Sequence, residues 1–309
     1  MQSVFEVVSV SEAAEAMRRA AAEGMRVSIE RTGGDLVFST VRLAEVVEHE
    51  AGDLTATVEG GIRLSALNER LAEDGQMLAL DPPGDPTVGA CIAANLSGPR
   101  RHRYGTARDL LLGVTIVLSD GTIASSGGKV VKNVAGYDLG KLFCGSEGRL
   151  GLIARASLRL HPRPGVSRTL VVHVGSAEEA GETVQALLRS TLVPSALDLL
   201  WPEKLAVLFE GGSRALDAQL AAARALVGGS EDSGEVWSEI ARRQAAAQGK
   251  ISFPPGELAA RLVELPEAVV RVSAGVAYVP EPVPDSRDGV LLALAERVRA
   301  ELDPQGVLA

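Results

Sequence analysis

Apolar and polar residues alternate along several short stretches of this chain, and each stretch predicts a β-strand. The clearest covers 152–160, where Leu and Ala at the even positions alternate with Arg155, Ser157 and Arg159. One face of this strand is therefore expected to be buried and the other exposed to solvent. Two expected strands, 114–118 and 122–126, flank Ser119-Asp-Gly121, whose Asp-Gly pair suits the two-residue turn of a hairpin. Shorter strands are expected at 25–29, 36–39, 45–49 and 54–59.

Helices are predicted where apolar residues recur three and four positions apart. Three leucines within 64–71 share one face of a helix that Gly75 ends. Ser9 and Glu12 have the spacing of a capping box and begin an alanine-rich helix that Gly24 closes. The mixture of short strands and helices indicates an α+β fold.

The proline-rich segment His161-Pro-Arg-Pro164 ends the strand at 152–160 and is the best domain boundary in the sequence. Beyond it, the order strand, helix, strand, strand, helix suggests a ferredoxin-like half-sandwich with a closing strand at 269–273. Helices at 236–248 and 290–302 are expected to complete this domain. The predicted units are residues 1–164, with lobes of about 1–60 and 61–164, and a C-terminal domain of residues 165–309.

The composition is that of a folded globular protein, with 309 residues, 46% hydrophobic and 23% charged, and a net charge of −9. This negative charge argues against a nucleic-acid binder, which needs a basic face. No apolar run approaches the ~20 residues that cross a bilayer, and the N-terminus lacks the features of a signal peptide, so we expect a cytoplasmic protein. The chain has 33 glycines and 3% aromatic residues, which indicates that part of its backbone must approach a neighbouring group closely, where a larger side chain would not fit.

Cysteine and histidine limit the chemistry. Cys91 and Cys144 are too few for a disulfide framework or a cluster with four thiolates, and they are expected to be small buried residues in a reducing cytoplasm. No two of the four histidines have the spacing that places ligands on one helical face, so no metal centre is predicted. No Gly-x-Ser-x-Gly elbow supports a hydrolase. The remaining option is an organic cofactor.

Residues 87–98 are almost all small and uncharged. They form either a helix packed closely against a sheet or a backbone whose N–H groups approach an anion such as a diphosphate. The basic run Pro99-Arg-Arg-His-Arg-Tyr104 is either a solvated face or a contact to a phosphate or a partner. Glycines further along, at 145, 148 and 151, do not give the G-x-G-x-x-G fingerprint, so a simple NAD-binding site is not predicted.

Five motifs, in their order and spacing, resemble the flavin-binding region of the FAD-linked oxidases of the vanillyl-alcohol-oxidase/PCMH type. They are Arg103-Tyr-Gly-Thr-Ala-Arg-Asp109, Leu118-Ser-Asp-Gly121, Lys132-Asn-Val-Ala-Gly-Tyr-Asp-Leu139, Gly145-Ser-Glu-Gly148 and Leu150-Gly-Leu-Ile153. Within this family the sequence is most similar to the FAD-binding subunit of bacterial glycolate oxidase. That likeness adds Gly75-Gln-Met-Leu78, Pro82-Pro83, Ser97-Gly-Pro-Arg-Arg101 and Leu302-Asp-Pro-Gln-Gly-Val307. It covers residues 5–165 well and the remainder thinly.

The resemblance implies an α+β protein with a two-lobed PCMH-type FAD-binding domain followed by a ferredoxin-like α+β cap domain near the flavin ring. FAD would lie non-covalently between the lobes, since no histidine occupies the short first loop. Residues that would contact the flavin or its diphosphate are Thr87, Val88, Gly89, Ala90, Gly98, Gly105 and Arg108. Residues that would line the adenine end are Gly148, Leu150, Gly151 and Ile153. Arg108 or Lys132 would tune the flavin by their charge, or would be structural ion-pair partners.

The resemblance further implies the FAD-binding subunit of a glycolate (2-hydroxyacid) oxidase or dehydrogenase complex. Such a subunit holds flavin for the oxidation of glycolate to glyoxylate or for electron relay, and we expect it to act within the complex rather than alone. Its partners would be a catalytic flavoprotein subunit and an iron–sulfur subunit. The subunit itself has no predicted membrane span, and it would lie at the periphery of the membrane through these partner subunits.

Two alternatives stay open. A scaffold subunit would keep the flavoprotein fold but bind FAD weakly or not at all. The short turn Glu30-Arg-Thr-Gly-Gly-Asp35 suggests it, because relatives carry a longer glycine-rich loop there and Glu30 would face the phosphates. A self-sufficient flavoenzyme is the other alternative, although no catalytic residue stands out and no histidine follows residue 173.

Overall fold

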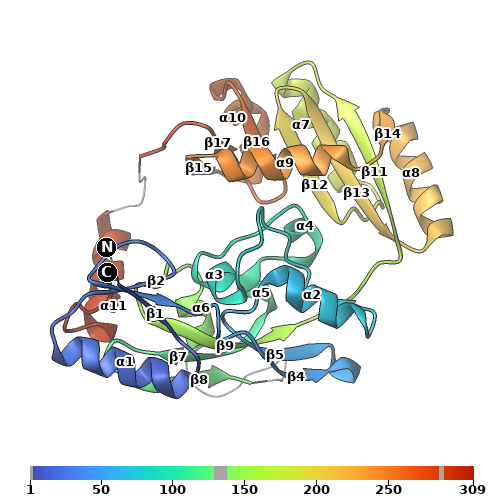
Figure 1. The fold of residues 1–309 in the computed structure, drawn as a ribbon. Helices are drawn as coiled ribbons and strands as arrows, with labels where there is room; N and C mark the ends of the chain where they lie inside the picture. The colour runs from blue at the N-terminus through green and yellow to red at the C-terminus, as the bar shows by residue number, and fades with distance from the viewer. Residues whose placement is uncertain (1–2, 129–137, 285–288) are drawn as a thin grey trace.

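The computed structural model describes residues 3–128, 138–284 and 289–309, and it divides into two bodies that lie one above the other (Figure 1). The lower body, the N-terminal half, contains all strands up to residue 162. The upper body, here called the cap, is built on the seven-stranded sheet of residues 166–279. Lys132 and the rest of its motif up to residue 137 lie outside the described residues.

A small parallel sheet opens the N-terminal half. Its strands, in the order β1-β3-β2, are β1 (Ser3–Glu6), β3 (Leu36–Ser39) and β2 (Val27–Ile29). Helix α1 (Val10–Ala22) packs on it through buried Ala and Met side chains. Ser9 Oγ accepts the backbone N–H of Glu12 at 3.1 Å, which confirms the predicted helix start.

A five-stranded antiparallel sheet forms the rest of the N-terminal half. Its order is β4 (Val46–Glu50), β5 (Thr55–Glu59), β9 (Leu152–Arg159), β7 (Leu111–Val117) and β8 (Ile123–Gly127). The predicted hairpin is confirmed by the pairing of β7 with β8. The predicted alternation of β9 is confirmed too: Leu152, Ala154, Ala156 and Leu158 are fully buried.

The two sheets divide between residues 39 and 46, earlier than the lobe boundary expected near residue 60. The reason is long-range pairing: β5 lies beside β9, so residues 46–59 join the second sheet rather than the first. Short helices cover the second sheet, and a two-stranded ladder leads to the cap. These elements are α2 (Leu64–Ala72), β6 (Gln76–Met77), α3 (Val88–Ala93), α4 (Arg101–Tyr104), α5 (Ala107–Leu110), α6 (Leu139–Phe143), β10 (His161–Pro162) and the 3-10 turn η1 (Ala51–Asp53).

The cap confirms the ferredoxin-like prediction in its first part. The elements in chain order are β11 (Val166–His173), α7 (Ala177–Arg189), β12 (Ala196–Trp201), β13 (Lys204–Gly211), α8 (Ser213–Val227) and β14 (Ser230–Asp232). Their antiparallel order β14-β11-β13-β12 is that of a ferredoxin-like sheet. The closing strand was expected at 269–273, and this was wrong. Residues 230–232 close the motif beside β11 instead.

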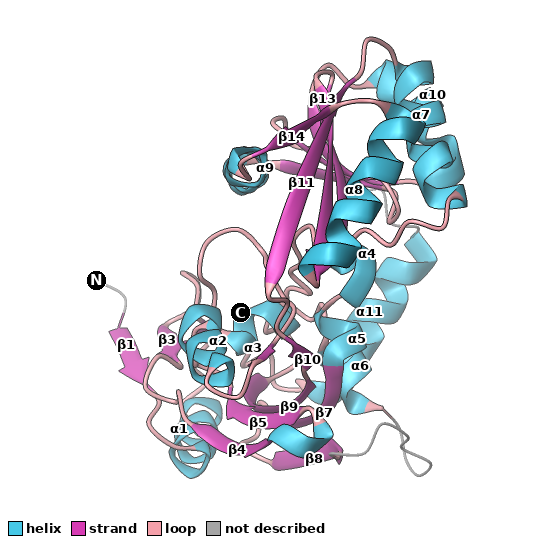
Figure 2. Ribbon diagram, turned by 90° about the vertical axis from the view of Figure 1, so that its right-hand side faces the viewer, coloured by secondary structure: helices cyan, strands magenta, loops and turns pink. Residues whose placement is uncertain are grey.

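A second group of elements extends the cap sheet on its other side. These are α9 (Glu235–Ala246), β15 (Gly249–Ser252), η2 (Pro255–Glu257), α10 (Leu258–Glu264), β16 (Ala268–Arg271) and β17 (Val276–Val279). Strand β16 pairs with β12, and β17 and β15 follow. Helices α7, α8 and α10 pack on one face of the sheet, and α9 packs on the other, as Figure 2 shows.

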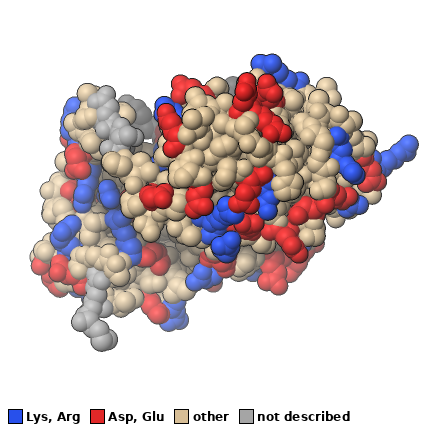
Figure 3. Space-filling model, turned by 90° about the horizontal axis from the view of Figure 1, so that it is seen from above, with Lys and Arg blue, Asp and Glu red and all other residues tan. Residues whose placement is uncertain are grey.

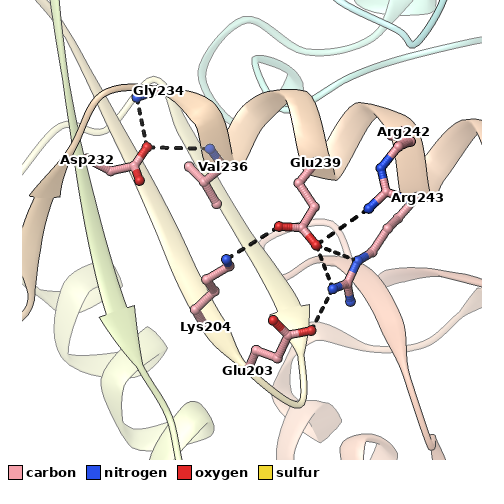
Figure 4. Close-up of polar contacts among 8 residues, drawn as sticks. All are labelled: Glu203, Lys204, Asp232, Gly234, Val236, Glu239, Arg242 and Arg243. Atoms are coloured by element: carbon pink, nitrogen blue, oxygen red, sulfur yellow. Dashed lines mark hydrogen bonds and ion pairs between the residues drawn. The ribbon is translucent and has the colours of Figure 1, made fainter.

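Helix α9 is held on the sheet by charged and polar contacts at both ends (Figure 4). Asp232 Oδ1 accepts the backbone N–H of Gly234 at 2.7 Å, just before the helix begins. Further along, the Glu239 carboxylate accepts from Arg243 at 2.6 Å and from Lys204 at 3.4 Å. These contacts lower the pKa of Glu239, chiefly through the Arg243 hydrogen bond. They fix the C-terminal turn of α9, which faces the N-terminal half.

The C-terminal segment leaves the cap and returns to the N-terminal half. Helix α11 (Gly289–Leu302) packs its Val298 and Leu302 against the core of the five-stranded sheet. Leu308 forms a parallel bridge with Val27 and is fully buried there. Figures 1 and 2 both place the C-terminal end of the chain in this lower body. The unit expected at 165–309 is therefore a cap of 166–279 inserted between two parts of one body.

Candidate functional site

A cavity of about 330 Å³ lies at the edge of the N-terminal parallel sheet. Strands β2 and β3 run in parallel with Ile29 opposite Phe38, so they end at the same edge. The residues that follow them, Glu30 and Thr40, form one wall. The carboxyl ends of parallel strands are where α/β sheets commonly bind ligands. The complete lining is Ile29, Glu30, Arg31, Thr40, Gly89, Ala90, Ala93, Ala94, Glu147, Gly148, Gly151 and Ile153.

The walls of this cavity are made of unusually small residues. Gly148 adopts φ +75°, and a Cβ at this position would lie 3.5 Å from the Cβ of Ile29 on the facing wall. A side chain at 148 would therefore narrow the cavity as well as strain the backbone. Across from it, α3 presents Ala90, Ala93 and Ala94 to the same space. The cavity is thus a narrow, largely apolar slot of the kind that accepts a flat organic molecule.

The small-residue segment forms a closely packed helix, as one of its two interpretations predicted, and the approach of its N–H groups to an anion stays a prediction. Gly89 is needed for close packing: its N–H donates to Gly60 O at 2.6 Å, and an added Cβ would lie 2.9 Å from the same oxygen. Thr87 Oγ1 accepts the N–H of Ala90 and starts the helix. Ala90 and Ala94, by contrast, leave room in the cavity. The segment is a close-packed helix whose remaining small side chains line the candidate site.

The structure gathers part of the predicted residue set in the cavity. Its lining includes Gly89, Ala90, Gly148, Gly151 and Ile153. Thr87 and Val88 lie next to it at the start of α3, and Leu150 is buried in the sheet core.

Three predicted residues lie away from the cavity lining. Gly98 packs on the carbonyl of Asp81, and Gly105 ends α4 with φ +84°. The Arg108 guanidinium donates to Lys141 O at 2.6 Å. Arg108 therefore has a structural partner, but this partner is a backbone carbonyl, so the predicted ion pair and the predicted influence on the flavin both stay predictions.

Sequence reasoning missed several lining residues, chiefly Thr40, Glu147 and the alanines at 93 and 94. Thr40 had a usable signal, because it directly follows a strand whose parallel neighbour ends at Glu30. Parallel pairing was not predicted for these short strands, so Thr40 was not predicted to lie beside Glu30. Glu147 is brought to the cavity by the N–H of its own backbone, which donates to Ala93 O at 2.7 Å.

The basic run at 100–103 serves a different purpose from those first considered, because it joins the N-terminal half to the cap. Arg100 Nη2 lies 2.6 Å from Glu210 Oε1, and the Glu210 side chain is only 1% exposed. His102 Nδ1 lies 2.8 Å from Ser273 Oγ. The partner of this run is thus the cap of the same chain. On the face of the molecule seen in Figure 3, acidic and basic side chains are interspersed rather than separated by sign.

The contact region between residues 97–103 of the N-terminal half and the cap is here called the joint. A buried ion pair supports the joint from the cap side. Arg271 on β16 pairs with Asp198 on β12, and both side chains are 1% exposed. Arg271 also contacts Gln244, whose Nε2 donates to Ser97 O of the N-terminal half at 3.1 Å. Burial raises the pKa of Asp198 to about 7, although the Arg271 charge opposes this rise. The joint is therefore a chain of polar contacts that connects the cap core to residues 97–103.

Asp81 gives the joint a measurable pH dependence. Burial raises its pKa from 3.8 to about 6, although Arg100 opposes the rise by its charge and its N–H. Between about pH 4 and 6 the folded state keeps this proton while the unfolded state loses it, so stability falls as the pH rises through this window. We expect Asp81→Asn, which cannot ionise, to gain stability relative to the wild type by up to about 3 kcal/mol between pH 4 and 7.

Urea unfolding at several pH values measures this difference. Asp85→Asn is the matched control, because contacts with Ser65 lower the pKa of Asp85 and reverse the sign. Its stability relative to the wild type should fall as the pH rises toward the ordinary pKa of an aspartate and should stay constant above it, across the window in which Asp81→Asn gains. Parallel curves for the wild type and Asp81→Asn would contradict the prediction.

A second cavity, of about 540 Å³, lies at the joint beside Arg100 and Glu210. It is larger than the first, but its central arginine is already neutralised by the buried glutamate. The cavity at the parallel sheet edge is the better candidate for a cofactor, because its walls are small, apolar and built from several separate segments.

Comparisons with known proteins agree with this choice. Residues 1–127 match the family model described as an FAD binding domain. The chain is 34% identical over 179 residues to glycolate oxidase subunit GlcD of Bacillus subtilis, covering 57% of this chain and 38% of that protein. It is 34% identical over 202 residues to glycolate oxidase subunit GlcE of Escherichia coli, covering 64% of this chain and 56% of that protein.

Other relatives carry a different name. A D-lactate dehydrogenase (cytochrome) of Saccharomyces cerevisiae is 33% identical over 187 residues, covering 55% of this chain and 32% of that protein. The chain thus spans between a third and somewhat over half of these curated relatives. Among solved structures, an alkyldihydroxyacetonephosphate synthase aligns over 98% of this chain and 75% of its own with a TM-score of 0.72 and 16% identity, which shows a shared fold.

The match over residues 1–127 identifies a flavin-binding domain in this chain. More particularly, the chain carries an FAD-binding domain of the PCMH type, related to glycolate oxidase subunits and D-lactate dehydrogenases, and its cofactor is FAD. The predicted fold class, family resemblance and cofactor are confirmed. The residues present fit the cofactor: Gly148 keeps the slot open against Ile29, and Arg31 brings a positive charge to its edge. Within the described residues, no helix is both long and apolar enough to cross a membrane.

Proposed function

We propose that this chain is the FAD-binding component of a 2-hydroxyacid oxidoreductase complex, with glycolate as its substrate. The observation that carries the proposal is the slot at the edge of the parallel sheet, eight of whose twelve lining residues lie in the segment that matches FAD-binding domains. The names of the relatives refer to glycolate and D-lactate, which are both 2-hydroxy acids. Bound FAD supplies the acceptor for the hydride that leaves the hydroxyl-bearing carbon.

The chain's own part in this chemistry is to hold the cofactor and exclude water from it. Gly89, Ala90, Gly148, Gly151 and Ile153 would surround FAD in the slot. One observation supports action within a complex rather than alone: two of the relatives are named as subunits. The expected partners remain a catalytic flavoprotein and an iron–sulfur subunit.

A side chain that fills the slot tests where FAD binds. Ala94 lines the cavity and is exposed, so Ala94→Trp would block the slot without disturbing the core. We expect FAD affinity to fall at least about tenfold, equivalent to about 1.4 kcal/mol, when FAD is titrated into the purified protein. Ala218→Trp, at an exposed position on α8, is the matched control and should bind FAD as the wild type does.

Dye reduction with glycolate and D-lactate then tests the substrate and the need for partners. The FAD-loaded chain alone should show little turnover, and the chain co-purified with its sister subunits should reduce the dye with glycolate. Fast turnover by the chain alone would instead establish a self-sufficient enzyme. Unchanged FAD affinity in Ala94→Trp would overturn the placement of the cofactor.

A further inference from the structure

Glu30 is placed unusually for a side chain that lines a flavin cavity. It directly follows β2 at the sheet edge and adopts φ +56°, a left-handed conformation that is unfavourable for residues other than glycine. The surrounding structure therefore holds it there by its contacts. Those contacts are with Thr40, the residue that follows the neighbouring parallel strand.

The Glu30 carboxylate binds Thr40 as an anion would. Its Oε1 accepts the backbone N–H of Thr40 and also the Thr40 hydroxyl, at 2.7 Å for the latter. A backbone N–H and a hydroxyl are donors that phosphate oxygens commonly use. Thr40 is 4% exposed and lines the cavity, so an anion that accepted from its N–H and hydroxyl would be shielded from water.

We propose that Glu30 is an internal anion that competes with the diphosphate of FAD for Thr40 and thereby limits the affinity of this chain for its cofactor. FAD would bind fully only when the carboxylate leaves Thr40, since two anions that share one donor pair at short range repel each other. This inference rests on the placement of FAD in the slot. It also gives a structural basis for the alternative of a subunit that binds FAD weakly.

The chain contains a matched control for this glutamate. Glu147 lines the same cavity, also has a positive φ, of +53°, and carries the same charge. Its carboxylate, however, pairs with Arg149 at 3.2 Å in an exposed ion pair and does not hold Thr40. Substitutions at 147 therefore report how FAD affinity responds to the loss of a negative charge in the cavity and, with glycine, to the loss of backbone strain at a positive φ. Substitutions at 30 add the release of Thr40.

The experiment titrates FAD into the apo forms of the full chain and of four variants, Glu30→Gln, Glu30→Gly, Glu147→Gln and Glu147→Gly, following flavin fluorescence. Glu30→Gln removes the charge but keeps an acceptor for Thr40, whereas Glu30→Gly removes both. We expect FAD affinity to rise several-fold in Glu30→Gln and about tenfold in Glu30→Gly. The two Glu147 variants report the effect of cavity charge and backbone conformation alone, so each should raise FAD affinity less than the matching Glu30 variant.

Riboflavin serves as the second probe because it has the ring system but no phosphates. Its affinity should be the same in the wild type and in both Glu30 variants, and thermal unfolding should show that all variants are folded. Equal FAD affinity in all proteins would overturn the competition and leave the cofactor site intact. An equal rise in the Glu147 variants would overturn it in favour of a general charge effect. Absence of FAD binding by every variant would overturn both the competition and the placement of FAD.

Discussion

Replacing Asp198 by Asn is expected to destabilise the protein by about 3–5 kcal/mol at pH 8, above the pKa of about 7 of this carboxyl group, because it leaves a buried cation without its counter-ion. Arg271 is 1% exposed, and arginine is the residue that proteins use to carry a buried positive charge. Its side chain also contacts Gln244 and lies 5.6 Å from the centre of the Tyr278 ring, both of which are neutral groups. In Asp198→Asn the buried guanidinium therefore loses the carboxylate that pairs with it.

The reverse substitution should cost less. In Arg271→Met the buried Asp198 is left alone, but it can bind a proton, and its pKa is already raised to about 7. A protonated carboxyl group is far cheaper to bury than a charged one. We therefore expect Arg271→Met to be the milder of the two variants, and its stability to fall as the pH rises above about 7.

Urea unfolding of both variants, at pH 6 and pH 8, measures this asymmetry. Arg261→Met is the control, since Arg261 makes only exposed ion pairs on α10 and should change nothing measurable. If Asp198→Asn and Arg271→Met were equally destabilised at both pH values, the explanation by proton uptake would be wrong.

Gly61→Ala is the second substitution with a large expected effect. A Cβ at Gly61 would overlap the carbonyl oxygen of Thr40 and lie 2.8 Å from the carbonyl oxygen of Leu43. Both obstacles are backbone atoms, so no side-chain rotation relieves them. We expect a loss of about 3 kcal/mol or more in the free energy of unfolding, at the upper end of the range for overpacked sites.

The same change should reach the cofactor site, because Thr40 lines it. The displaced backbone would carry the Thr40 N–H away from the cavity, so FAD affinity should fall together with stability. Gly52→Ala is the matched control: nothing lies within 4 Å of its added Cβ, and its φ is not positive. Thermal unfolding and FAD titration of both variants test the prediction. A Gly61→Ala protein as stable as the control would contradict it.

Local patterns sufficed for the elements whose residues carry their own signal. The leucines of α2, the alternation of β9 and the Asp-Gly turn between β7 and β8 each encode structure within a few residues. The small-residue stretch before α4 indicated a crowded backbone, and the cavity indeed draws several of its walls from it. The family motifs then led to the cofactor.

Long-range partners were beyond reach of such patterns. The edge strand β14 consists of Ser, Glu and Asp, so no apolar period marks it, and a more hydrophobic segment was preferred as the closing strand. The purpose of Arg100 depends on Glu210, which is 110 residues away. Likewise, whether Glu30 repels a ligand or binds Thr40 depends on the parallel pairing of two very short strands. These features follow from tertiary packing, which a single sequence does not display.

The return of the C-terminal segment to the first body has a consequence for the order of events during synthesis. A ribosome completes residues 166–279 before it has made Val307 and Leu308, so the cap has all of its strands available first. The N-terminal half is translated earlier, but its core around Val27 and Phe38 is completed only when Val307 and Leu308 have been made. We therefore expect nascent chains that end near residue 285 to show a protease-resistant cap and a protease-sensitive flavin domain, the reverse of the usual N-terminal-first order.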